Sequence, residues 1–154
     1  MIKQEEILEA QNKWGNQIVK LGVDYREKKD FEKTAWLLVD ELYGYHEGPV
    51  LFKPTKASRK QFRLTRKSAV SYFIGHNPDF AEDKGFALEP WEKVRFKNAE
   101  FILGEEQAVA MGNYFFTNYQ GIETKVEFTL GFFRSKNGTL KINLHHSSLP
   151  FQGE

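Results

Sequence analysis

Cysteine is absent from this chain of 154 residues. The absence excludes disulfide bonds, thiolate-bound zinc and a cysteine nucleophile, and it leaves the redox compartment open. A surplus of one charge is absent as well, because 22 Lys and Arg residues are balanced by 21 Asp and Glu residues, for a net charge of +1. A chain balanced in this way has no field of one sign that would recruit nucleic acid or a membrane surface.

Long apolar runs are also missing. No apolar run is long enough to cross a bilayer, and the first residues, MIKQEEILEA, lack the apolar core and the small-residue cleavage site of a secretory signal. We therefore expect a cytoplasmic protein, or a periplasmic one if a signal peptide has been removed. The length suits one domain over residues 1–154, which is enough to bury a core.

Three segments in the first half show helical patterns. The first covers residues 4–28, the second begins after an N-cap at Asp30 and ends near Gly44, and the third follows an N-cap at Thr65 and ends at Gly75. In the first segment, positions three and four apart form one face with a single polar interruption: Ile7, Gln11, Trp14, Ile18, Leu21 and Tyr25.

Strand patterns fill the remainder of the chain. Residues 48–55 and 60–65 predict two short strands that pair with each other, the first bounded by prolines. From Trp91 the apolar period changes to two, and short turns separate four longer runs, namely 91–103, 106–119, 124–135 and 139–148. Helices followed by a four-stranded meander predict an α+β fold, with the helices on one face of a curved antiparallel sheet.

Two pairs of adjacent phenylalanines fall in these strands. Neighbouring residues of a strand point to opposite faces, so Phe115–Phe116 and Phe132–Phe133 place one ring on each side of the sheet. Each ring left in water forfeits roughly 1.5–3 kcal/mol. We expect a homodimer to cover the outer face around these four rings and His146. Loops, the C-terminal tail or a local bulge are the alternative cover.

The adjacent histidines of the last strand follow the same rule. His145 and His146 point to opposite faces, so they do not form a metal pair, and no HExxH or acidic calcium loop is present. We predict neither a metal site nor a cofactor. By alternation, Asn143, His145 and Ser147 share one polar face, which either lines a cavity or is the solvated side of the sheet.

Three segments carry a resemblance to a known family: DFEKTAWLLVDELYGY (30–45), VRFKNAEFILGEEQAVAMGNYFFT (94–117) and the terminal KINLHHSSLP (141–150). With the order of elements, they resemble the nuclear transport factor 2-like, or SnoaL-like, superfamily. The branch they look most like holds the association domain of calcium/calmodulin-dependent kinase II and its bacterial relatives. GPVLFKPTKASRKQFR (48–63) also looks like a block shared by uncharacterised bacterial members.

This resemblance implies a cone-shaped, cystatin-like fold. A strongly bent antiparallel sheet would wrap the long N-terminal helix, leave a pocket at its wide end and dimerise through its outer face. Association domains carry an arginine on the next-to-last strand, and VEFTLGFF (126–133) has none. Members include isomerases, cyclases and dehydratases as well as proteins that only bind ligands or assemble, so the fold does not fix the function.

Two functional hypotheses follow. The first is a domain with a conical pocket for a small acidic or aromatic ligand, which assembles as a homodimer or a larger oligomer. The alternative is a SnoaL-like isomerase, cyclase, dehydratase or hydrolase. It would use His145 with a carboxylate, for which Glu127 is the candidate, as acid and base. Without a carboxylate near His145, the enzyme hypothesis has no acid–base pair.

Each candidate site residue also has a purely structural interpretation. His145 either works in the pocket or is a structural histidine hydrogen-bonded to backbone. Trp14 is either a pocket wall or part of the core, and Glu127 is either a base or a surface charge. The basic candidates either hold an acidic ligand or are solvated charges at the edge of the sheet. The full set of ligand-binding candidates is Trp14, Tyr43, Lys53, Arg63, Tyr72, Arg95, Asn143 and His145.

Overall fold

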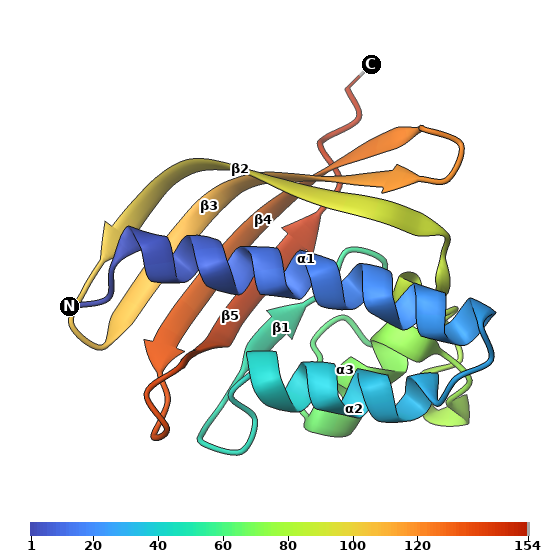
Figure 1. The fold of residues 1–154 in the computed structure, drawn as a ribbon, viewed down its shortest axis with the longest axis horizontal. Helices are drawn as coiled ribbons and strands as arrows, with labels where there is room; N and C mark the ends of the chain where they lie inside the picture. Colours follow the sequence, from blue (N-terminus) through green and yellow to red (C-terminus); the bar gives the residue numbers. More distant parts are fainter. Residues whose placement is uncertain (154) are drawn as a thin grey trace.

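The computed structural model describes residues 1–153 and contains a bent five-stranded sheet with three α-helices on one face (Figure 1). The helix α1 lies across the sheet, and α2 and α3 are grouped beside its C-terminal half. The elements, in chain order, are α1 (Gln4–Arg26), α2 (Phe31–Leu42), β1 (Leu51–Lys53), α3 (Arg66–Ile74), the 3₁₀ turns η1 (Pro78–Phe80) and η2 (Phe86–Leu88), β2 (Trp91–Leu103), β3 (Gln107–Asn118), β4 (Glu123–Arg134) and β5 (Leu140–Ser148).

The predicted helix caps are confirmed. The Asp30 carboxylate accepts a hydrogen bond from the Lys33 backbone N–H (3.1 Å), and the Thr65 hydroxyl accepts one from the Ser68 N–H (3.2 Å). Each bond satisfies a donor that the first helical turn leaves unpaired. Gly75 ends α3 with φ of 67°, a left-handed conformation that suits glycine. Within residues 1–153, no helix has the length and apolar character to cross a bilayer.

The sheet has the order β1-β5-β4-β3-β2, and the predicted meander of β2 to β5 is confirmed by antiparallel pairing throughout. The prediction for residues 60–65 was wrong, because that segment forms no strand. Its Arg63 N–H donates to the Phe52 carbonyl (2.7 Å), but the Arg63 side chain is anchored to the Lys60 and Ser68 carbonyls, which holds the segment as a loop. The strand β1 instead pairs in parallel with β5.

A β-bulge at Asn143 changes which residues of β5 point inward. Gly131 pairs with Leu144 and Phe132 with Ile142, so Asn143 is an extra residue on this strand. As a result, Ile142, His145 and Ser147 are buried on the helix side, whereas the Asn143 side chain bonds to Gln107 at the surface (2.8 Å). Strict alternation therefore placed Asn143 and Ile142 on the wrong faces.

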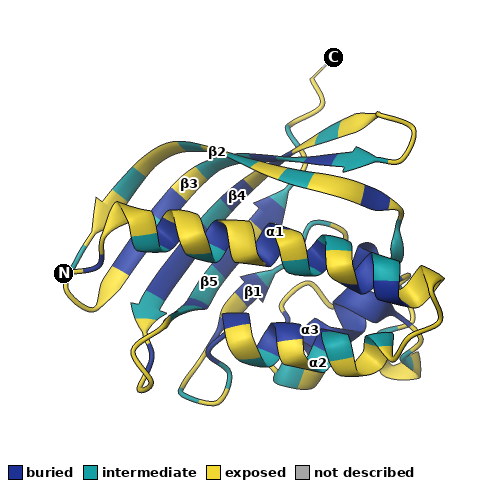
Figure 2. Cartoon of the chain, viewed as in Figure 1, coloured by how far each residue is buried: buried dark blue, intermediate teal, exposed yellow. Residues whose placement is uncertain are grey.

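The doubled phenylalanines do straddle the sheet, because one ring of each pair is buried and the other is only partly buried. Figure 2 shows how buried and more exposed residues are distributed along β3 and β4. Phe116 and Phe132 are buried beneath the helices, so they do not belong to the predicted outer interface. On the outer face, the Arg95 guanidinium covers Phe115 at 4.1 Å from its ring centre. Phe133 packs so closely on Gly44 that a side chain there would overlap its ring. The chain thus covers part of its own outer face.

Candidate functional site

His145 occupies the centre of the inner face of the sheet, on β5, and only 2% of it is exposed. Aromatic rings fix its position on several sides. Phe52 of β1 stacks on the imidazole with ring centres 4.8 Å apart and an interplanar angle of 14°. Trp14 of α1 meets it edge-on at 5.7 Å, at an interplanar angle of 82°. The elements α1, β1 and β5 therefore hold the imidazole in one orientation.

Both nitrogens of His145 are hydrogen-bonded to tyrosines. Nδ1 lies 2.8 Å from the Tyr43 hydroxyl, which itself accepts a hydrogen bond from the Trp14 indole N–H (3.0 Å). Nε2 lies 3.1 Å from the hydroxyl of Tyr114 on β3. Both ring nitrogens are thus satisfied by side chains rather than by the backbone, and the histidine connects the helix side of the core to a group of hydroxyls.

Those hydroxyls come from four separate parts of the chain. The Tyr114 hydroxyl is in close contact with the Ser147 hydroxyl, and Ser147 Oγ lies 2.6 Å from the Oγ1 of Thr55, in the loop after β1. A fourth hydroxyl, that of Tyr72 on α3, accepts a hydrogen bond from the Lys56 backbone N–H (3.1 Å). Together they form the polar side of a small cavity.

The cavity has a volume of about 10 Å³, enough for about one water molecule. Its walls are apolar on the other sides, and its lining residues are Trp14, Phe52, Pro54, Thr55, Tyr72, Phe73, Phe86, Tyr114, His145 and Ser147. Phe86 also lines two surface hollows of about 220 and 210 Å³, both of which border the Lys56–Glu89 ion pair (2.7 Å). Phe86 therefore separates the cavity from solvent together with Thr55, which borders the larger of these hollows and is half-buried, and Tyr72, which borders the smaller one.

Burial keeps the titratable groups around this cavity uncharged. Desolvation is the main cause that lowers the pKa of His145 to about 3, with a smaller contribution from His146. Desolvation also raises the pKa of Tyr43, Tyr72 and Tyr114 well above the usual value. At neutral pH the site therefore consists of a neutral imidazole and neutral hydroxyls.

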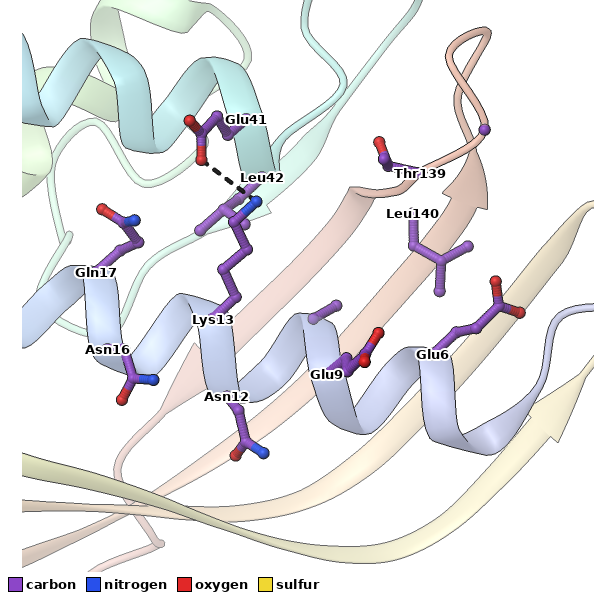
Figure 3. Close-up of a pocket in the computed structure, with 12 residues that line it drawn as sticks. Glu6, Glu9, Asn12, Lys13, Asn16, Gln17, Glu41, Leu42, Thr139 and Leu140 are labelled. Atoms are coloured by element: carbon purple, nitrogen blue, oxygen red, sulfur yellow. Dashed lines mark ion pairs between the residues drawn. The ribbon is translucent and has the colours of Figure 1, made fainter.

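Larger hollows lie elsewhere and have a different character. A groove of about 700 Å³ lies between α1, α2 and the β4–β5 turn. Its lining side chains are drawn in Figure 3, which includes the ion pair of Lys13 and Glu41 (3.3 Å). A second hollow, of about 710 Å³, borders the turns near Glu47 and Glu105. Both are lined mainly by surface polar side chains. We place the candidate site in the small cavity because buried polar groups converge only there among these hollows.

The structure brings together some of the residues that the sequence suggested. Trp14, Tyr72 and His145 line the cavity, and Tyr43 lies one hydrogen bond behind it. Lys53 points away from the cavity, and its ammonium group donates to the Ser147 carbonyl (3.1 Å).

The other suggested residues lie outside the cavity. Arg63 is fully buried but bound to Asp83 (2.6 Å), and Arg95 pairs with Glu123 (3.3 Å) on the outer face. Asn143 is on the bulge. Glu127 is exposed and lies near the Ser148 hydroxyl (3.4 Å), so it does not reach His145.

Sequence reasoning missed two hydroxyl groups at the site. Tyr114 has the same strand parity as the buried Phe116, which is a signal that could have placed it on the inner face. Thr55 stands in a turn after Pro54 and follows no periodic pattern, so nothing in the sequence marks it. Within the described residues, no group of three or more His, Asp or Glu side chains is arranged to hold a metal ion.

Comparisons with known proteins agree on one family. The family model described as metal-independent carbonic anhydrase matches residues 5–149. A metal-independent carbonic anhydrase of Nostoc sp. (strain PCC 7120) is 44% identical over an alignment 154 positions long, which covers 98% of this chain and 75% of that protein. The crystal structure of a cyanobacterial iota-carbonic anhydrase complexed with bicarbonate has 42% identity and a TM-score of 0.95, covering 99% of this chain and 94% of the other.

More distant structures share the fold alone. An association-domain protein of the calcium/calmodulin-dependent kinase II type from Xanthomonas campestris is 19% identical, with a TM-score of 0.65 over 99% of this chain and 91% of the other. A nuclear transport factor 2-like protein from Salmonella enterica is 15% identical, with a TM-score of 0.58 over 97% and 92%. The predicted nuclear transport factor 2-like fold is confirmed.

Proposed function

The chain belongs to the metal-independent carbonic anhydrase family, and we propose that it catalyses the reversible hydration of carbon dioxide to bicarbonate. The observation that carries the proposal is the buried, uncharged cavity in which Thr55, Tyr114 and Ser147 present hydroxyl groups beside His145. This activity is more specific than either hypothesis from the sequence. One was a ligand-binding domain, and the other was an isomerase, cyclase, dehydratase or hydrolase that uses His145 with a carboxylate.

The cavity suits a small neutral substrate. Carbon dioxide is linear and carries no net charge, so the apolar walls formed by Phe52, Phe73 and Phe86 can bind it without a desolvation penalty for an ion. The hydroxyls offer hydrogen bonds to its oxygens. Since the cavity has room for only about one water molecule, we expect carbon dioxide to displace a flexible wall, for which Phe86 is the candidate.

A hydroxyl in this position can move protons without becoming charged. As the water oxygen bonds to the carbon, a water proton passes to Thr55 Oγ1, and the Thr55 hydroxyl proton passes to an oxygen of carbon dioxide. The broken C–O π bond supplies the electron pair that receives this proton. The product is carbonic acid, which ionises to bicarbonate and a proton when it reaches solvent. Thr55 ends the step as it began.

His145 has a positioning role in this scheme. Because burial lowers its pKa to about 3, the imidazole does not take up a proton near neutral pH. Its Nε2 instead orients Tyr114, which contacts Ser147, which contacts Thr55. Preorganised hydrogen bonds of this kind in a cavity with little water are worth more than the same bonds in solution.

Stopped-flow measurement of carbon dioxide hydration tests the proposal. The wild-type protein, dialysed against a chelator, is expected to accelerate hydration. Thr55→Val keeps the shape of the side chain and is expected to lower kcat/KM roughly 100-fold or more, the size typical of a lost proton-transfer group. The matched control is Thr129→Val in β4, which lies on the outer side of the sheet. Wild-type rates equal to those of buffer would contradict the proposal.

We also propose a homodimer through the outer face of the sheet. Leu51 and Met111 point outward from β1 and β3 and are 58% and 57% exposed, and Phe115 and Phe133 are only partly covered. A second copy would remove these side chains from water. Light scattering after gel filtration is expected to give a dimer that Met111→Glu or His146→Glu dissociates. A wild-type monomer would contradict this assembly.

The cytoplasmic location stays a prediction.

A further inference from the structure

The hydrogen bonds behind His145 can be satisfied in one direction only. The Trp14 indole N–H is a donor and has no acceptor site, so the Tyr43 oxygen must accept from it. The Tyr43 hydroxyl hydrogen then has one available acceptor among the described contacts, which is His145 Nδ1 at 2.8 Å. The opposite arrangement, with the hydrogen on Nδ1, would leave the buried Tyr43 hydrogen without an acceptor, and an unpaired donor inside the core costs its full desolvation penalty.

This direction continues through the cavity. With Nδ1 as the acceptor, the neutral imidazole carries its hydrogen on Nε2 and donates it to the Tyr114 oxygen (3.1 Å). Tyr114 then donates to Ser147, and Ser147 donates to Thr55 Oγ1 (2.6 Å). The Thr55 hydrogen is the last of the chain. The acceptors open to it are the Tyr72 hydroxyl, which lines the same cavity beside Thr55, and a molecule bound in the cavity.

We infer that Trp14 and Tyr43 are positioning residues, which fix His145 as the Nε2–H tautomer and thereby make the Thr55 hydroxyl a hydrogen-bond donor toward the cavity. A donor at this point suits the oxygens of carbon dioxide and of bicarbonate. A reversed chain would present a lone pair and would repel them. For its catalytic consequence this inference rests on the proposed function, but the tautomer itself does not.

Packing supports the same conclusion. Trp14, Tyr43, Tyr114 and His145 are each no more than 2% exposed, so solvent offers no substitute partner. The imidazole is stacked on Phe52 and approached edge-on by Trp14, which opposes rotation of the ring. The tautomer is therefore set by the hydrogen-bond partners and not by exchange with water.

Nuclear magnetic resonance can read the tautomer directly. Long-range ¹H–¹⁵N spectra of protein labelled on histidine distinguish the two neutral tautomers, and the signals of His145 are identified by removing the others in His46→Gln, His76→Gln and His146→Gln. The wild type is expected to show the Nε2–H tautomer alone from about pH 5 to 9. In Tyr43→Phe and in Trp14→Phe, a measurable share of the Nδ1–H tautomer is expected.

Activity supplies the second readout. Both variants are expected to lower kcat/KM for carbon dioxide hydration roughly 10- to 100-fold, the range seen when a group that orients a metal-binding histidine is removed. Tyr45→Phe is the matched control, because it deletes a neighbouring hydroxyl that donates to the Arg63 carbonyl (2.7 Å) outside the chain of bonds. It is expected to keep the wild-type tautomer and rate.

Three results would overturn the inference: a wild-type Nδ1–H tautomer or mixture, variants with an unchanged tautomer, or an equal loss of activity in Tyr45→Phe. If Tyr43→Phe does not fold, the spectra of the wild type and of Trp14→Phe still show which tautomer His145 adopts and whether Trp14 fixes it. If the wild type does not hydrate carbon dioxide, the proposed function fails, and the spectra continue to test the tautomer separately.

Discussion

Two largely buried polar clusters lie near Tyr72, and they satisfy their polar groups in different ways. The cavity cluster, defined by Thr55, Tyr114, His145 and Ser147, is made of neutral groups. The charged cluster, defined by Arg63, Asp83 and Ser71, holds a fully buried guanidinium bound by a carboxylate through two oxygens (2.6 and 2.7 Å). The Arg63 guanidinium lies 5.8 Å from the centre of the Tyr72 ring.

The two clusters therefore have different roles: the charged cluster contributes to stability, and the cavity cluster contributes to the chemistry. A buried charge is tolerated when it is paired with an opposite charge and hydrogen-bonded, and the Arg63 side chain meets this condition with two backbone carbonyls in addition to Asp83. No charge from this cluster lines the cavity. The charged cluster therefore anchors the loop before α3, and the cavity keeps a neutral environment in which hydroxyls can act on a neutral substrate.

The largest expected effect comes from breaking the charged cluster. Asp83→Asn keeps the side-chain shape but leaves the buried Arg63 without its counter-charge, which typically costs about 3–5 kcal/mol of unfolding free energy. Urea unfolding measures the change. The control is Arg63→Met combined with Asp83→Leu, which removes both charges and is expected to recover much of the loss. A cost below about 1 kcal/mol for Asp83→Asn would show that this pair does not anchor the loop.

The second-largest effect is expected from acid, which should lower the free energy of unfolding through His145 in the cavity cluster. The folded-state pKa of His145 is lowered to about 3 from 6.5, so between these pH values the unfolded chain binds a proton that the folded chain does not. Stability is therefore complete above about pH 6.5 and falls as the pH drops toward 3, by up to about 1.4 kcal/mol per pH unit for this one group. Urea unfolding of the wild type and of His145→Gln, compared at pH 7 and 5, checks this. The same pH dependence in both proteins would assign the acid sensitivity to other groups.

The smallest effect is expected at the exposed Lys56–Glu89 pair, between the two hollows outside Phe86. Lys56→Gln should change the unfolding free energy by less than about 1 kcal/mol, because solvent screens exposed pairs. Its melting temperature should stay within a few degrees of the wild-type value. A loss of unfolding free energy as large as that of Asp83→Asn would show that the exposed pair and the buried pair contribute equally to stability.

The sequence predicted local structure well because its signals are local. The caps at Asp30 and Thr65 and the period of two after Trp91 depend on residues a few positions apart, and each was confirmed. The segment 60–65 was predicted as a strand because its alternation is genuine. The side chain of Arg63, however, binds Asp83, twenty positions away, and such a partner cannot be read from spacing.

The site was only partly predictable for the same reason. His145 was recognised from its place in a strand, and Trp14 from the apolar face of a helix. Thr55 and Ser147 are 92 positions apart, and their contact exists because β1 pairs in parallel with β5. The bulge at Asn143 also moves the inward register by one residue. Neither the parallel pairing nor the bulge leaves a mark in the composition or period of the chain.

The pH dependence of carbon dioxide hydration tests the central claim, that a neutral hydroxyl cavity performs the reaction, most directly. With a His145 pKa of about 3 and tyrosine pKa values raised by burial, no group lining the cavity changes charge near neutral pH. Stopped-flow kcat/KM of the chelator-treated wild type is therefore expected to be constant from about pH 5.5 to 9. A sigmoidal profile with a midpoint near 7 would require a titrating base and would contradict the account.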